Sequence, residues 1–89
     1  MMLARVEGSI TATRKHPSLR GWRLLICQPV NHRGENVGSP VVAIDAHGAG
    51  LHQQVVVSTD GRAARRAVKD QKSPVRMMII AVADEVHGG

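Results

Sequence analysis

The segment from Val75 to Val86 constrains the fold most, because it is apolar on both faces of a strand. Alternation at period two gives one face and then the other: Met77, Ile79, Ala81 and Ala83, against Met78, Ile80, Val82 and Val86. An antiparallel sheet in a small domain normally leaves one face to solvent. Leaving either face wet would forfeit roughly 1.5–3 kcal/mol for each large side chain. We therefore expect the second face to meet another subunit, through an interface strand of Met77, Met78, Ile79, Ile80 and Val82.

The short length of the chain makes burial of apolar surface by another subunit more favourable. The 89 residues suffice for one domain, spanning residues 1–89, and a chain this short buries a smaller share of its surface than a large domain does. Trp22 is the only aromatic residue, although Phe and Tyr usually supply large parts of a small core. Burial through oligomerisation would make up part of that deficit.

The rest of the chain reads as short strands separated by turns. Residues 3–13 alternate apolar and polar side chains, which is typical of a half-buried strand. Residues 22–28, 41–45 and 53–59 are three further apolar runs, separated by segments rich in Gly, Pro and Asn. Asp60 or Thr59 is placed to cap a short, polar helix that begins near Gly61 and covers one end of the sheet. The sequence predicts an all-β fold, a small five-stranded barrel of the OB-like type with one short helix.

A glycine-rich turn follows the third of these strands, where residues 43–50 read Ala-Ile-Asp-Ala-His-Gly-Ala-Gly. Glycine permits positive φ and close backbone approach, so the turn could cradle a phosphate or pack tightly against another chain. A phosphate loop needs a helix to begin at the glycines, and here a valine-rich strand follows instead. We therefore favour a structural turn. His47, Gly48, Ala49 and Gly50 are therefore candidates for close packing against another chain.

The positive charge of the chain raises nucleic-acid binding as an alternative function. The formal net charge is +5, and the densest cationic cluster is Arg62, Arg65, Arg66 and Lys69. That spacing is also typical of a solvated helix face. OB-folds hold single strands by stacking bases on aromatic side chains, and this chain offers one tryptophan. An OB-fold nucleic-acid-binding module stays the alternative, but no nucleic-acid partner is expected.

The sequence shows no sign of an active site. Cys27 lies within an apolar run, which indicates a buried thiol in a reducing compartment rather than a nucleophile. The five histidines lack the close, regular spacing of metal ligands, and the carboxylates form no evident catalytic pair. We expect no catalytic residue, cofactor or metal. No apolar run is long enough to span a membrane and no secretion signal is evident, so a cytoplasmic location is expected.

Five fragments, in order, resemble one known family, the pentameric vertex proteins of bacterial microcompartment shells, including those of carboxysomes and ethanolamine-utilisation compartments. The resemblance covers about residues 2–87. The fragments are residues 4–15, residues 18–21 with 24–29, residues 43–50, residues 55–58 with 61–65, and Pro74 with residues 79–84. The run at residues 43–50 matches the most recognisable signature of the family.

This resemblance implies an OB-like barrel protomer, a cyclic homopentamer and a structural, non-enzymatic role. Such pentamers cap the vertices of a polyhedral shell that is otherwise tiled by hexameric proteins. A closed ring uses a heterologous interface, so two different surfaces of each protomer must make contacts. In such a ring the turn of His47, Gly48, Ala49 and Gly50 is expected at a subunit interface, with the further hypothesis that it borders a narrow central pore. The chain departs from the family pattern at Arg76, where an acidic residue is frequent, and at His47, where a small or aliphatic residue is common. Residues 51–54 also lack the glycine–acid pair often seen after the signature.

Overall fold

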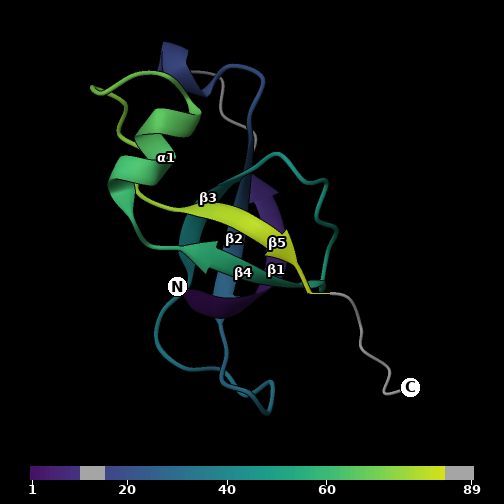
Figure 1. Ribbon diagram of the computed structural model, residues 1–89. Helices are drawn as coiled ribbons and strands as arrows, with labels where there is room; N and C mark the ends of the chain where they lie inside the picture. Colours follow the sequence, from purple (N-terminus) through teal and green to yellow (C-terminus); the bar gives the residue numbers. More distant parts are fainter. Residues whose placement is uncertain (11–15, 84–89) are drawn as a thin grey trace.

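The computed structural model describes residues 1–10 and 16–83. Five strands close into a barrel, with a short 3-10 helix and one α-helix at one end (Figure 1). The elements in chain order are β1 (Met2–Ile10), η1 (Pro17–Leu19), β2 (Arg23–Pro29), β3 (Val41–Asp45), β4 (Gln54–Ser58), α1 (Gly61–Ala67) and β5 (Met78–Val82). The predicted five-stranded barrel with one short helix is confirmed.

The barrel closes because β1 pairs with strands on both of its edges. The order around the barrel is β1-β2-β3-β5-β4. Four of the five pairings are antiparallel, and β3 and β5 meet in a short parallel pairing at Ile44 and Met78. Within the described residues, closure leaves no long strand edge open to edge-to-edge association.

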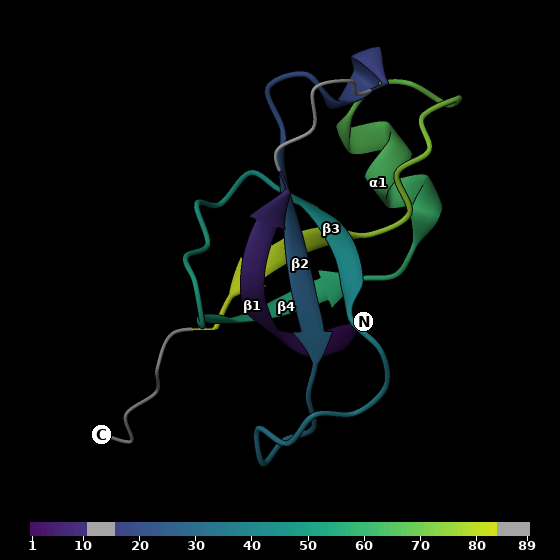
Figure 2. The same ribbon diagram turned by 180° about the vertical axis from the view of Figure 1, so that it is seen from behind.

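Two apolar clusters hold the fold together. The first fills the barrel interior, and its buried members are Ala4, Val6, Leu25, Cys27, Ala43, Ala49, Val55, Val57 and Ile79. The second lies outside the barrel, where η1 and α1 pack over the strands (Figure 2), and its buried members are Leu19, Ile44, Ala64 and Val75. Trp22, Leu24, Val68 and Met78 pack against the second cluster while staying partly exposed. The helix therefore lies at one end of the barrel, as predicted.

Local sequence signals place several element ends correctly. The third strand spans Val41–Asp45, as predicted. Asp60 is the N-cap of α1, and its side chain accepts a hydrogen bond from the backbone N–H of Arg62. The first strand ends at Ile10, and the predicted extension over residues 11–13 lies outside the described residues.

The predicted face alternation of the last strand is wrong beyond Ile79. Val57 pairs with Ile79 and Val56 pairs with Ala81, so Ile80 is an extra residue in a β-bulge. The bulge shifts the alternation by one, so that Val82 packs on the barrel core and Ala81 is exposed. The strand also begins three residues later than predicted, and residues 84–86 lie outside the described part of the chain.

A similar bulge interrupts β1. Val6 pairs with Cys27 and Gly8 pairs with Ile26, so Glu7 has no partner of its own in the ladder. The exposed Glu7 carboxylate accepts a hydrogen bond from Arg5, which lowers the pKa of Glu7. Arg5 also donates a hydrogen bond to the side-chain oxygen of Asn36.

Among residues 1–10 and 16–83, no helix is long and apolar enough to cross a bilayer.

Candidate subunit-contact site

The glycine-rich turn after β3 is organised by the carboxylate of Asp45. Its side chain has no exposed surface and accepts three backbone hydrogen bonds from the turn that follows. Oδ1 accepts the N–H of His47 at 2.8 Å, and Oδ2 accepts those of Gly48 at 3.1 Å and Ala49 at 2.9 Å. Asp side chains commonly stabilise turns by accepting backbone N–H groups a few residues ahead. This carboxylate fixes the path of the turn.

Arg23, at the start of β2, clamps the same turn from outside. Its Nη1 donates to Asp45 Oδ2 at 3.1 Å and to the carbonyl oxygen of Ala49 at 3.1 Å. The Arg23 side chain is half exposed, whereas that of Asp45 is fully buried. The ion pair offsets the cost of burying the carboxylate, and the guanidinium ties both ends of the turn to β2.

This arrangement excludes the phosphate-loop interpretation of the glycine turn. The amides of His47, Gly48 and Ala49 are the donors that a phosphate would need, and Asp45 already occupies all three. The N–H of Gly50 donates to Oε1 of Gln53 at 2.6 Å. A buried carboxylate at the centre of the turn would also repel an anion. The structural-turn interpretation is the one that the geometry supports.

The four predicted turn residues lie in different environments. His47 and Gly48 are exposed, and Gly48 has φ +77°, with open space where a Cβ would lie. Ala49 has no exposed surface, because its methyl group belongs to the barrel core. Gly50 is half-buried beside Gln53. His47 and Gly48 are therefore available for contact with a neighbour, whereas Ala49 acts within its own barrel; the role of the turn at an interface or pore stays a prediction.

Sequence reasoning missed Leu51, the most exposed large apolar side chain of this turn, at 61%. His52 follows with φ +68°, a conformation that few non-glycine residues adopt. The N–H of His52 donates to the carbonyl of Val6 at 2.7 Å, which ties the turn to β1. The strain at His52 is thus offset locally, and Leu51 is held outward.

Four of the five predicted interface-strand residues are divided between the two clusters. Met77, Ile79 and Val82 contact the barrel core. Met78 packs on the second cluster, so its cover comes from its own chain rather than from a neighbour. Ile80, the bulge residue, is half-buried. The protomer itself thus buries much of the apolar surface of this strand, and contact of the strand with another subunit stays a prediction.

Cys27 lies in the barrel interior with no exposed surface. Burial, and then the nearby charge of Asp45, raise the pKa of the Cys27 thiol from 9.0 to about 11. The thiol is therefore neutral at physiological pH, which fits a packing role and not a nucleophilic one. Within residues 1–10 and 16–83, no three His, Cys, Asp or Glu side chains gather as metal ligands would.

We expect Cys27 to resist alkylation in the folded protein. The two-unit difference in pKa alone lowers its thiolate fraction at pH 8 by roughly 100-fold, and burial slows the reaction further. Iodoacetamide labelling followed by mass spectrometry, with and without denaturant, measures the ratio of rates. Because the folded state holds the thiol proton more tightly, stability should also fall as pH rises from about 9 towards 11. Equal labelling rates in folded and unfolded protein would contradict the placement of this thiol.

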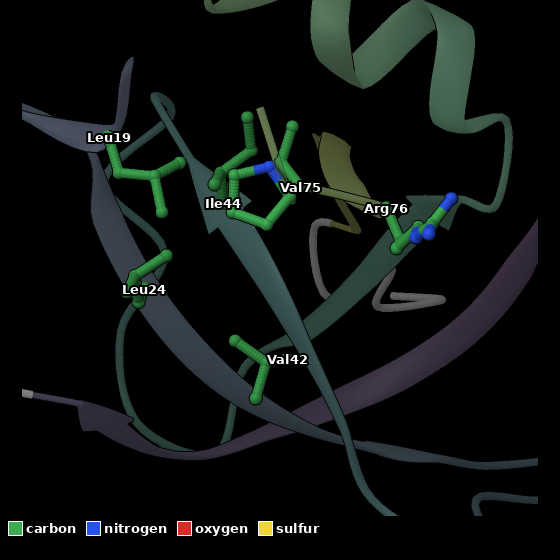
Figure 3. A pocket seen from close by; sticks show the side chains of 7 residues that line it. Leu19, Leu24, Val42, Ile44, Val75 and Arg76 are labelled. Carbon is green, nitrogen blue, oxygen red and sulfur yellow. The ribbon is translucent and has the colours of Figure 1, made fainter. Parts of the chain in front are cut away.

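A small apolar groove lies on the outer face of the barrel, beside the second cluster. It has a volume of about 250 Å³ and is lined by Leu19, Leu24, Val42, Ile44, Pro74, Val75 and Arg76. Figure 3 shows these side chains, which come from η1, β2, β3 and the segment leading into β5. Six of the seven are apolar, and Arg76 supplies the one charge. The groove lacks the convergent polar groups that orient a small-molecule substrate.

The fold defines a class, the small closed five-stranded β-barrels with one short helix. A family described as "Ethanolamine utilisation protein EutN/carboxysome" matches residues 1–84. The chain belongs to this family, and the resemblance noted from the sequence is confirmed.

Individual relatives agree with this assignment. The carboxysome shell vertex protein CcmL of Nostoc sp. is 38% identical over 88 residues, covering 98% of this chain and 86% of that protein. The microcompartment shell vertex protein EutN of Escherichia coli is 38% identical over 89 residues, covering 100% and 93%. Both relatives are structural shell proteins by name, and neither name supports the nucleic-acid alternative.

Solved structures extend the agreement to three dimensions. A structure of an ethanolamine utilization protein, EutN, matches with a TM-score of 0.85 and 38% identity, covering 100% of this chain and 93% of that one. The GrpN pentameric microcompartment shell protein from Rhodospirillum rubrum matches with a TM-score of 0.81 and 30% identity, covering 98% of both chains. The barrel described above is therefore the protomer fold of pentameric shell proteins.

Proposed function

We propose that this chain is a structural protein of a bacterial microcompartment shell, located in the cytoplasm, which assembles as a homopentamer and caps shell vertices. The observation that carries the proposal is the end-to-end match in sequence and fold to shell vertex proteins. The proposed mechanism is geometric. Five identical wedges close a vertex that hexagonal tiles cannot close, and the partners around each pentamer are hexameric shell proteins.

The composition of the surface supports a non-enzymatic role. The site consists of a turn whose amides are occupied by Asp45 and a groove with one charged side chain. Neither offers a nucleophile beside a base, which covalent catalysis requires. The heterologous contacts of a ring instead require two different surfaces on each protomer. The turn with His47 and Leu51 and the groove beside Arg76 are two such surfaces.

Native mass is the first test of this proposal. We expect native mass spectrometry and light scattering to give five times the chain mass of 9.6 kDa. The matched functional measurement is co-production with hexameric shell proteins, in which closed shells should form only when this chain is present. A stable monomer across micromolar concentrations, or closed shells without the chain, would contradict the vertex function.

A further inference from the structure

The groove lined by Val42 and Arg76 is a surface that a single protomer leaves unfilled. Val42 is 48% exposed on β3, and Leu24, Ile44, Pro74 and Val75 complete an apolar wall around it. An apolar hollow of this size fits one or two aliphatic side chains from a partner. Arg76 has no ion-pair partner among residues 1–10 and 16–83, where the two ion pairs are Arg5–Glu7 and Arg23–Asp45.

The charge around the groove indicates an acidic partner. The end of the molecule formed by η1, α1 and residues 68–77 (Figures 1 and 2) carries seven cations: Arg20, Arg62, Arg65, Arg66, Lys69, Lys72 and Arg76. Its two described acids are Asp60, which caps α1, and Asp70, which accepts the N–H of Lys72 at 2.8 Å. A segment with carboxylates beside an aliphatic side chain would complement both the charge and the apolar wall.

The chain contains one segment of that chemistry outside the described residues. The six residues after Ala83 read Asp-Glu-Val-His-Gly-Gly, with two carboxylates, one aliphatic side chain and no Lys or Arg. Arg5 is the cation near the point where this segment begins, since Ala83 donates to the carbonyl of Gln54 and Gln54 pairs with Arg5. Arg5 is already engaged by Glu7 and Asn36.

Reach decides between the segment's own protomer and a neighbour. β5 carries the chain away from the groove, so Ala83 lies seven residues, or roughly 23 Å of extended chain, beyond Arg76. Val86 lies three residues beyond Ala83, so it reaches at most roughly 11 Å from Ala83 when the chain is fully extended, and a path around the barrel surface is longer than a straight one. The segment begins beside β4 and β1, whereas the groove lies on the outer face of β2 and β3. Its own groove is therefore out of reach.

We propose that the C-terminal segment, residues 84–89, docks in the groove of the adjacent subunit, with Val86 in the apolar hollow and Asp84 and Glu85 facing Arg76. This inference rests on the proposed pentamer. The contact joins two different surfaces of the protomer, so repeating it around a ring fills each groove once and leaves no segment unused. It also gives a use to Arg76, the one charged side chain of the groove.

Cross-linking between subunits tests the contact directly. Subunits carrying Val42→Cys are co-produced with subunits carrying Val86→Cys and treated with a short bismaleimide, which bridges two thiols by addition without a leaving group. The matched control replaces Val42→Cys with Val37→Cys, because Val37 is similarly exposed, at 44% against 48%, and lies on the loop before β3. Cys27 does not compete, since it is buried.

We expect a covalent dimer of the Val42→Cys and Val86→Cys subunits at least fivefold above the Val37→Cys control. Arg76→Glu should lower that yield severalfold, and Arg62→Glu, at an exposed α1 cation that does not line the groove, should lower it much less. A protein of pentameric mass with no cross-link above the control would overturn this inference and leave the vertex function standing. An intramolecular cross-link in a chain that carries both Val42→Cys and Val86→Cys would also overturn it. A monomeric native mass would contradict both this inference and the vertex function.

Discussion

Replacing Asp45 by alanine should lower the free energy of unfolding by about 3 kcal/mol. The substitution removes the acceptor of three backbone N–H groups, one of them on the fully buried Ala49, and strands the clamp made by Arg23. A hydrogen bond to a charged group contributes about 1.5–3 kcal/mol, but two of the freed amides lie on exposed residues and can bind water. For a domain of this size the melting temperature should fall by roughly 12–24 °C. Chemical denaturation at fixed protomer concentration measures it, because assembly would otherwise shift the transition.

Arg23→Ala is the matched control for that experiment. Loss of the Arg23 side chain leaves the buried Asp45 carboxylate without its counter-charge but keeps the three amide hydrogen bonds intact, and water can reach the space of the half-exposed side chain. Arg23→Ala should therefore cost about 1–2 kcal/mol, less than Asp45→Ala. Asp45→Asn should fall between the two, because an amide retains one acceptor oxygen but directs an NH₂ group at backbone donors. Equal losses of stability in Asp45→Ala and Arg23→Ala would show that Asp45 stabilises the protein through its ion pair with Arg23 and not through its hydrogen bonds to the turn.

Most of the fold was predictable because its signals are local. Asp60 followed by an alanine-rich run marks the start of a helix through capping and propensity, both of which act within one turn. The run at Val41–Asp45, bounded by Pro40 and the glycine turn, likewise marks a strand at both ends. The order of elements followed from these signals and from the resemblance to a known family.

The bulges at Glu7 and Ile80 were not predictable from period-two alternation. Each is defined by pairing with a strand far away in sequence, so nothing adjacent in the chain marks it. The bulge at Ile80 moves Val82 to the barrel side and exposes Ala81, which alternation had assigned the other way. The cover over Met78 is also non-local, since it comes from elements that pack on the outside of the barrel.

The site was partly predictable. The glycine turn offered Gly48 and Gly50 as positions for a positive φ, and of these two Gly48 adopts it and Gly50 does not. The role of Asp45 had a readable signal as well, because an acid placed two to four residues before turn amides is typical of a side-chain-stabilised turn. The groove had no such signal, since its lining comes from four separate segments that meet only in the folded chain.

Ala49→Leu should lower the free energy of unfolding of the protomer by about 3 kcal/mol. This effect is on the folding of the single subunit and does not depend on assembly. Ala49 has no exposed surface and sits among the barrel-core side chains, so an isobutyl group there must displace its neighbours. Overpacking of a filled core typically costs about 1–3 kcal/mol, and a closed barrel of five strands has little freedom to expand. Denaturant unfolding at low protomer concentration measures the loss, and native mass at a concentration where the barrel stays folded reports on assembly.

Ala46→Leu is the matched control, because Ala46 is exposed on the same turn and the added side chain meets solvent. Its unfolding free energy should change by less than about 0.5 kcal/mol. The two variants separate two roles of the turn. A loss of stability in Ala49→Leu alone would place the Ala49 methyl group in the barrel core. A loss of pentamers in Ala46→Leu alone would place the outer surface of the turn at a subunit contact. Normal barrel stability in Ala49→Leu would contradict the burial on which this assignment depends. The turn thus acts on both sides, with Asp45 and Ala49 building the protomer from within and the exposed residues left for a neighbour.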